Sequence, residues 1–71
     1  MVEEMRIIEP PICYPVKNKI GVHTECLTQI RVTHNAIFVT VTPSGEERQL
    51  GYTLSHDASK ALRQRYPEYF L

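Results

Sequence analysis

The sequence predicts an α+β fold, in which a four-stranded antiparallel meander carries one C-terminal helix on one face. Two patterns predict it: apolar and polar residues alternate through the centre of the chain, and a helical apolar pattern appears near its end. Turn signals separate the alternating runs, so neighbouring runs pair as hairpins. Because the central run is long enough to bend, a small, partly open barrel with a helix is the alternative.

The length of 71 residues corresponds to a single small domain, residues 1–71. We expect residues 1–9 to form an extended arm, because Pro10 and Pro11 interrupt any earlier strand, and residues 67–71 to form an apolar tail. Eight basic residues balance eight acidic ones, which excludes a bulk electrostatic attraction to nucleic acid or anionic membranes. Apolar residues make up 42% of the chain, a fraction typical of folded proteins.

The longest predicted strand runs from Ile20 to Val32. Its even positions carry apolar and β-branched residues and its odd positions mostly polar ones. Since successive side chains of a strand point to opposite faces, we expect the even positions to face the core. Leu27 does not fit this alternation, and the strand is unusually long, so we expect a bend or bulge near Glu25–Leu27.

Two turns connect this strand to the strands that follow it. His34 and Asn35 form the first turn, because asparagine tolerates a left-handed backbone. This turn pairs Val32 with Ile37, Ile30 with Val39 and Thr28 with Val41. Pro43–Glu46 forms the second turn, in which Gly45 accepts a positive φ. The second turn places Leu50 opposite Val39, Tyr52 opposite Ile37 and Gly51 opposite Phe38.

A first strand precedes the long one and pairs with its front half. Ile12, Tyr14 and Val16 alternate with other residues, and Pro15 confines the segment to a sheet edge because it lacks an N–H group. The expected register places Cys13 opposite His23 and on the other face from Cys26. We therefore expect no disulfide bond between the cysteines and no convergent zinc site.

The helix begins after Leu54. Ser55 is a favourable N-cap, and Asp57 complements the positive end of the helix dipole. Ala58, Ala61, Leu62 and Tyr66 share one face at helical spacing. Because the residue before a proline disfavours helical geometry, the helix ends about Arg65–Tyr66, before Pro67.

No group of residues indicates catalysis, a metal or a cofactor. Cys13 beside His23 and Glu25 has the composition of an activated thiolate, but the open sheet face supplies no oxyanion donor. Ser55-His56-Asp57 has the letters of a triad, but neighbouring side chains on a helix point about 100° apart. We therefore expect a protein without enzymatic activity.

The predicted function is that of a non-enzymatic protein–protein interaction module. Surplus apolar residues in both terminal segments favour a homo-oligomer such as a homodimer, which binds a protein partner through a sheet face, an edge strand or a tail. The alternative is a small RNA- or single-stranded-DNA-binding protein that uses the outer sheet face and the basic helix. The candidate binding residues are Arg31, Phe38, Lys60, Arg63, Tyr69 and Phe70.

The location expected from the sequence is cytoplasmic. The N-terminal residues show no apolar run after a basic start, so they do not have the pattern of a signal peptide. No stretch approaches the length of apolar sequence that spans a bilayer, so we expect no membrane partner.

Overall fold

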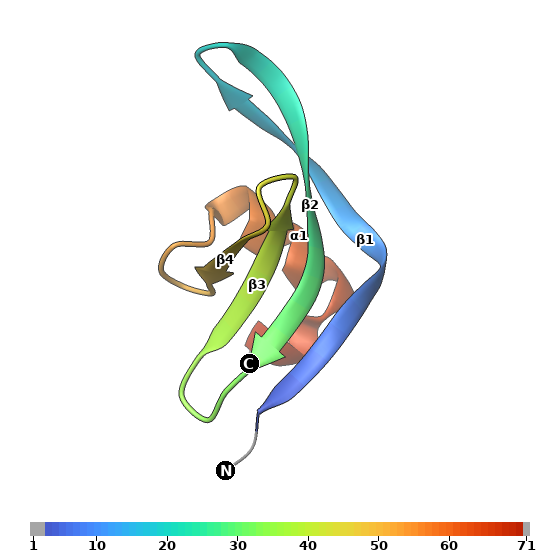
Figure 1. Cartoon of the computed structure of the whole chain (residues 1–71), viewed down its shortest axis with the longest axis vertical. Coiled ribbons are helices and arrows are strands. Elements are labelled where there is room, and N and C mark those ends of the chain that lie inside the picture. Colours follow the sequence, from blue (N-terminus) through green and yellow to red (C-terminus); the bar gives the residue numbers. More distant parts are fainter. Residues whose placement is uncertain (1–2, 71) are drawn as a thin grey trace.

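A computed structural model describes residues 3–70 of the chain. Its strands are β1 (Glu4–Asn18), β2 (Gly21–Val32), β3 (Ile37–Thr42) and β4 (Glu46–Gln49), followed by helix α1 (His56–Arg65) and the 3₁₀ helix η1 (Pro67–Phe70). The strands form one antiparallel sheet in the order β1-β2-β3-β4. The sheet is open, and α1 contacts β1 (Figure 1). The predicted meander with a C-terminal helix is confirmed.

The core lies between one face of the sheet and α1. Burial of apolar surface is the main stabilising contribution in a domain of this size. Leu62 of α1 and Ile30 of β2 are fully buried there. The buried residues are Ile8, Tyr14, Leu27, Ile30, Val39, Val41, Leu54, Ala58 and Leu62.

A bulge at Thr28 reverses which side chains of β2 face the core. The two predicted pairs nearest the first turn are confirmed, but the register then shifts between Leu27 and Gln29. As a result Leu27, rather than Thr28, lies opposite Val41 and is fully buried. A bulge sets two residues against one, so the alternation changes phase. The expectation that even positions face the core was therefore wrong for the part of β2 that precedes the bulge.

The two cysteines form a disulfide bond across β1 and β2. Cys13 lies opposite Cys26, with an Sγ–Sγ distance of 2.03 Å. The expectation of no disulfide was wrong for two reasons. The partner of His23 is Val16 rather than Cys13, and the phase change at Thr28 turns Cys26 to the same face as Cys13. Because the two sulfur atoms are bonded to each other, neither cysteine is available as an activated thiolate.

β1 continues through the segment that contains two prolines. From Glu4 onward the predicted arm is extended and pairs with β2, and its register shifts between Ile7 and Ile12. Pro10 and Pro11 lie within this irregular stretch, so they interrupt the pairing without ending the strand. Residues 1 and 2 of the predicted arm lie outside the described residues.

β4 is shorter than expected and pairs differently. Gln49 lies opposite Phe38, and the N–H of Leu50 donates to the carbonyl of Ile37 at 2.8 Å. The predicted partners of Leu50, Gly51 and Tyr52 were therefore wrong. The chain leaves the sheet after Gln49 and turns, and the carbonyl of Gln49 accepts hydrogen bonds from the N–H groups of Tyr52, Thr53 and Leu54. Tyr52 is 80% exposed as a result.

The helix begins and ends where the sequence predicts. Ser55 is the N-cap and accepts a hydrogen bond from the N–H of Ala58 at 3.2 Å, and Arg65 is the last helical residue. The apolar tail folds into η1, whose Tyr69 and Phe70 pack against the core. Residue 71, also part of the predicted tail, lies outside the described residues.

Candidate functional site

The outer half of the β1–β2 hairpin projects from the rest of the molecule, at the top of Figure 1. β3 pairs with β2 only from Cys26 onward, so residues 14–25 form a two-stranded ribbon. We refer to residues 14–25 as the ribbon. It makes the molecule elongated, with extents of 43 × 24 × 22 Å. Within the part of the chain that the structure describes, no third strand pairs with the ribbon on either side.

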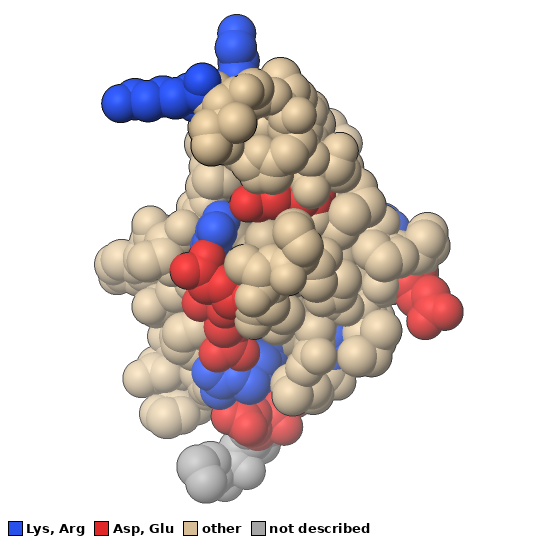
Figure 2. Space-filling model, turned by 45° about the horizontal axis from the view of Figure 1, so that its top comes forward, with Lys and Arg blue, Asp and Glu red and all other residues tan. Residues whose placement is uncertain are grey.

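The end of the ribbon presents apolar side chains to solvent. Ile20 is 96% exposed and Val22 is 68% exposed. The turn that carries them is held by Asn18, whose Oδ1 accepts hydrogen bonds from the N–H groups of Ile20 and Gly21 at 2.9 and 3.1 Å. Basic side chains extend from the same end (Figure 2), where the sequence places Lys17 and Lys19.

A polar cluster fixes the base of the ribbon to β4. Glu25 accepts a hydrogen bond from the hydroxyl of Tyr14 at 2.9 Å and lies 3.6 Å from Arg48 and 3.7 Å from His23. Burial, together with the hydrogen bond to Glu25, raises the pKa of Tyr14 to about 12. Tyr14 therefore stays protonated near neutral pH. It serves as a hydrogen-bond donor there, without the ionised form that nucleophilic or base chemistry requires.

The structure brings Arg31 and Phe38 together on the face opposite α1, as the sequence predicts. The guanidinium carbon of Arg31 lies 4.5 Å from the ring centroid of Phe38. The same guanidinium donates two hydrogen bonds to Glu47 and one to Glu3, each at 2.9 Å. This pairing lowers the pKa of Glu47. Figure 2 shows the result as a column of alternating acidic and basic side chains, in which the charge of Arg31 is already compensated.

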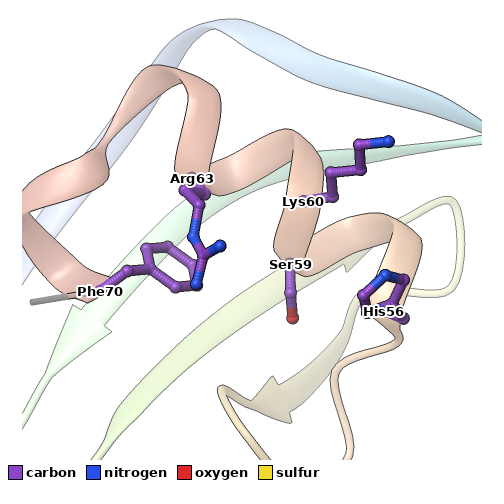
Figure 3. Close-up of a pocket in the computed structure, with 5 residues that line it drawn as sticks. All are labelled: His56, Ser59, Lys60, Arg63 and Phe70. Carbon is purple, nitrogen blue, oxygen red and sulfur yellow. The ribbon is translucent and has the colours of Figure 1, made fainter.

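Three other predicted residues meet at a groove beside α1. Lys60 and Arg63 line it together with Phe70 of η1, and its volume is about 320 Å³. The guanidinium carbon of Arg63 lies 5.1 Å from the ring centroid of Phe70. His56 and Ser59 complete the lining (Figure 3). We refer to this feature as the α1 groove.

Tyr69 contacts β1 rather than either of these surfaces. Its hydroxyl accepts a hydrogen bond from Arg6 at 3.0 Å, and its ring lies 6.0 Å from that of Tyr66. Arg6 also pairs with Glu68 at 3.5 Å. Tyr69 therefore joins the C-terminal segment to the start of the sheet.

Sequence reasoning missed Ile20 and Val22, which it assigned to the buried face. One signal in the sequence could have found them. The strand that starts near Ile20 is about twice as long as the run after the first turn, so its front half has no third strand to cover it.

Among the described residues, neither helix has the length and apolar character needed to cross a membrane. Within residues 3–70, no three His, Cys, Asp or Glu side chains lie close enough together to share a metal ion. Comparison of the chain with protein-family models, with curated proteins and with solved structures gave no match.

Proposed function

We propose that this protein is a non-enzymatic protein–protein interaction module, that it acts as a homo-oligomer, and that the ribbon is its main contact surface. The observation that carries this proposal is the exposure of Ile20 and Val22 at the end of a ribbon with which, among residues 3–70, no third strand pairs. Single exposed apolar residues are common. Two of them on a ribbon whose edges have unpaired backbone groups are typical of a strand that pairs with another chain.

The apolar contribution of such a contact is modest. Full burial of an aliphatic side chain contributes about 1.5–3 kcal/mol, so four side chains, Ile20 and Val22 from each of two copies, contribute about 6–12 kcal/mol. Association itself costs about 4–15 kcal/mol. We therefore expect a reversible dimer that forms as the concentration rises, with added stabilisation from backbone hydrogen bonds between the ribbons. A twofold axis places the same patch of both copies in contact.

Light scattering coupled to size-exclusion chromatography, over a series of protein concentrations, tests this proposal. The double variant Ile20→Thr/Val22→Thr removes the apolar contact and keeps β-branched residues in the strands. Tyr52→Thr is the matched control, because Tyr52 is 80% exposed but lies outside the ribbon. The wild type and the control should increase in mass towards the dimer at high concentration, whereas the double variant should remain monomeric with an unchanged melting temperature. A wild type that is monomeric at every concentration contradicts the proposal, as does association that the double variant leaves intact.

The alternative function, binding of RNA or single-stranded DNA, combines Arg31 and Phe38 with Lys60 and Arg63. These two pairs lie on opposite sides of the sheet, and the charge of Arg31 is offset by Glu47. We therefore rank it second. A mobility-shift assay with a single-stranded oligonucleotide distinguishes the two functions: the interaction module shows no shift at low salt, whereas a nucleic-acid-binding protein shows a shift that added salt abolishes.

A further inference from the structure

Two cationic side chains line the α1 groove, Lys60 and Arg63. Arg6, Arg31 and Arg48 each form an ion pair with a carboxylate. Within residues 3–70, neither Lys60 nor Arg63 forms one. Two cations that line one groove and form no ion pair favour an anionic ligand, because like charges that share a surface are stabilised when an anion neutralises them.

The guanidinium of Arg63 is held in place before any ligand arrives. It lies against the ring of Phe70, with 5.1 Å between the guanidinium carbon and the ring centroid (Figure 3). A planar guanidinium stacked on an aromatic ring retains its N–H donors at its edge. Since the side chain is already ordered, less conformational entropy is lost when it binds an oxyanion.

Two further side chains with hydrogen-bonding groups, Ser59 and His56, point to the same side of α1 as Arg63. Figure 3 shows both of them directed to that side, one and two turns closer to the start of the helix, while the ammonium group of Lys60, which also lines the α1 groove, points away from these three side chains. His56 is in the first turn, where the helix dipole adds positive potential. The nearby carboxylate of Asp57 does not line the α1 groove; it lines a neighbouring hollow together with Lys60 and Tyr14.

We propose that the α1 groove binds a phosphate monoester, carried either by a small molecule or by a phosphorylated side chain of a partner. A phosphate monoester has close to two negative charges near neutral pH and several acceptor oxygens. The fork of Arg63 matches two of those oxygens, and Lys60, Ser59 and His56 supply donors for the others. A carboxylate or a phosphodiester has only one charge and leaves part of this set unpaired. The site shares no residue with the ribbon, so it is independent of the proposed self-association.

Nuclear magnetic resonance titration of the ¹⁵N-labelled full chain tests this site. The probes are phenyl phosphate, phosphoserine, a phosphoserine peptide and, as the monoanionic comparison, a dinucleotide with one phosphodiester. The monoesters should shift the backbone amide signals of His56, Ser59, Lys60 and Arg63, and they should bind at least several times more tightly than the phosphodiester. Tighter binding of the peptide than of free phosphoserine assigns the phosphate to a partner protein, and equal binding assigns it to a small molecule.

Two charge-matched variants make the test specific. Arg63→Gln should weaken the binding of phenyl phosphate about tenfold or more, because it removes a charge-assisted hydrogen bond. Lys17→Gln removes one positive charge from the ribbon, far from the α1 groove, and should leave the affinity unchanged. The proposal is overturned if no monoester shifts the four amide signals, if the phosphodiester binds as tightly as the monoesters, or if both variants weaken binding equally. The last outcome would indicate attraction to net charge only.

Discussion

Loss of the Cys13–Cys26 disulfide should destabilise the protein substantially and disorder the ribbon first. The bond joins residues 13 positions apart, and closure of a loop of this length contributes about 3 kcal/mol in the chain-entropy account of disulfides. A domain of 71 residues has a free energy of unfolding of about 4–11 kcal/mol at the usual value per residue. For a domain this small, a loss of about 3 kcal/mol lowers the melting temperature by about 10–25 °C.

The ribbon is the part that depends most on this bond. An isolated two-stranded hairpin is marginally stable in water, and the disulfide lies where the ribbon leaves the rest of the sheet, since Cys26 also pairs with Thr42 of β3. Without the bond, the amides of residues 14–25 should exchange with solvent faster, while those around Ile30 should be affected less.

Circular dichroism melts with and without reductant, on the wild type and on Cys13→Ser/Cys26→Ser, measure the effect. Hydrogen exchange locates it. Reductant should lower the melting temperature of the wild type and leave that of the variant unchanged. The reasoning is refuted if the mass of the purified, unreduced protein corresponds to two free thiols, or if reduction leaves the melting temperature within a few degrees of its starting value. Disulfides are rare in the reducing cytosol, and those that form there are usually transient. If the protein has the expected cytoplasmic location, the Cys13–Cys26 bond must therefore form and break reversibly.

Three further predictions concern the core, the helix cap and one tyrosine. Leu62→Ala should lower the free energy of unfolding by about 2–5 kcal/mol, because Leu62 is fully buried; a urea titration that shows a loss below about 1 kcal/mol contradicts the packing described. Ser55→Ala should lower it by about 1 kcal/mol through loss of the acceptor for the N–H of Ala58, and Ser55→Asp should restore it. The pKa of Tyr14 is raised to about 12, so the stability linked to its protonated form is complete below pH about 10 and is lost as the pH approaches 12. An absorbance titration of phenolate should show one late component that Tyr14→Phe removes, and a wild type without that component refutes the hydrogen bond to Glu25.

The parts of the fold that depend on local chemistry could be predicted from the sequence. The bounds of α1 follow from the hydroxyl of Ser55 and from Pro67, both of which act within one turn of the helix. The register beside His34 and Asn35 was predictable because a tight turn fixes the pairing of the residues next to it.

The parts that depend on irregular pairing could not be predicted. The bulge at Thr28 was expected one to three residues earlier. When the position of a bulge is unknown, it is also unknown which face of the sheet each preceding side chain occupies. The wrong expectation of no disulfide between Cys13 and Cys26 followed partly from that error and partly from the wrong β1–β2 register, because both determine which face of the sheet each cysteine occupies.

The sequence predicted individual residues of the candidate sites, but not which of them lie together. Lys60 and Arg63 could be chosen because they lie on the polar side of an amphipathic helix, but their proximity to Phe70 depends on how η1 folds back, which periodicity does not specify. The alternation of apolar and polar residues also does not show where β3 ends. Ile20 is exposed because β3 ends before it could cover that part of the hairpin.

Because Ile20 and Val22 are exposed, the requirement for a stable core and the requirement for a contact surface fall on different residues. Neither side chain supports the core, so substitutions at these positions leave the folding equilibrium nearly unchanged, and under the proposed function they alter which chains the ribbon binds. The stability of the fold therefore places little constraint on which residues stand at the end of the ribbon.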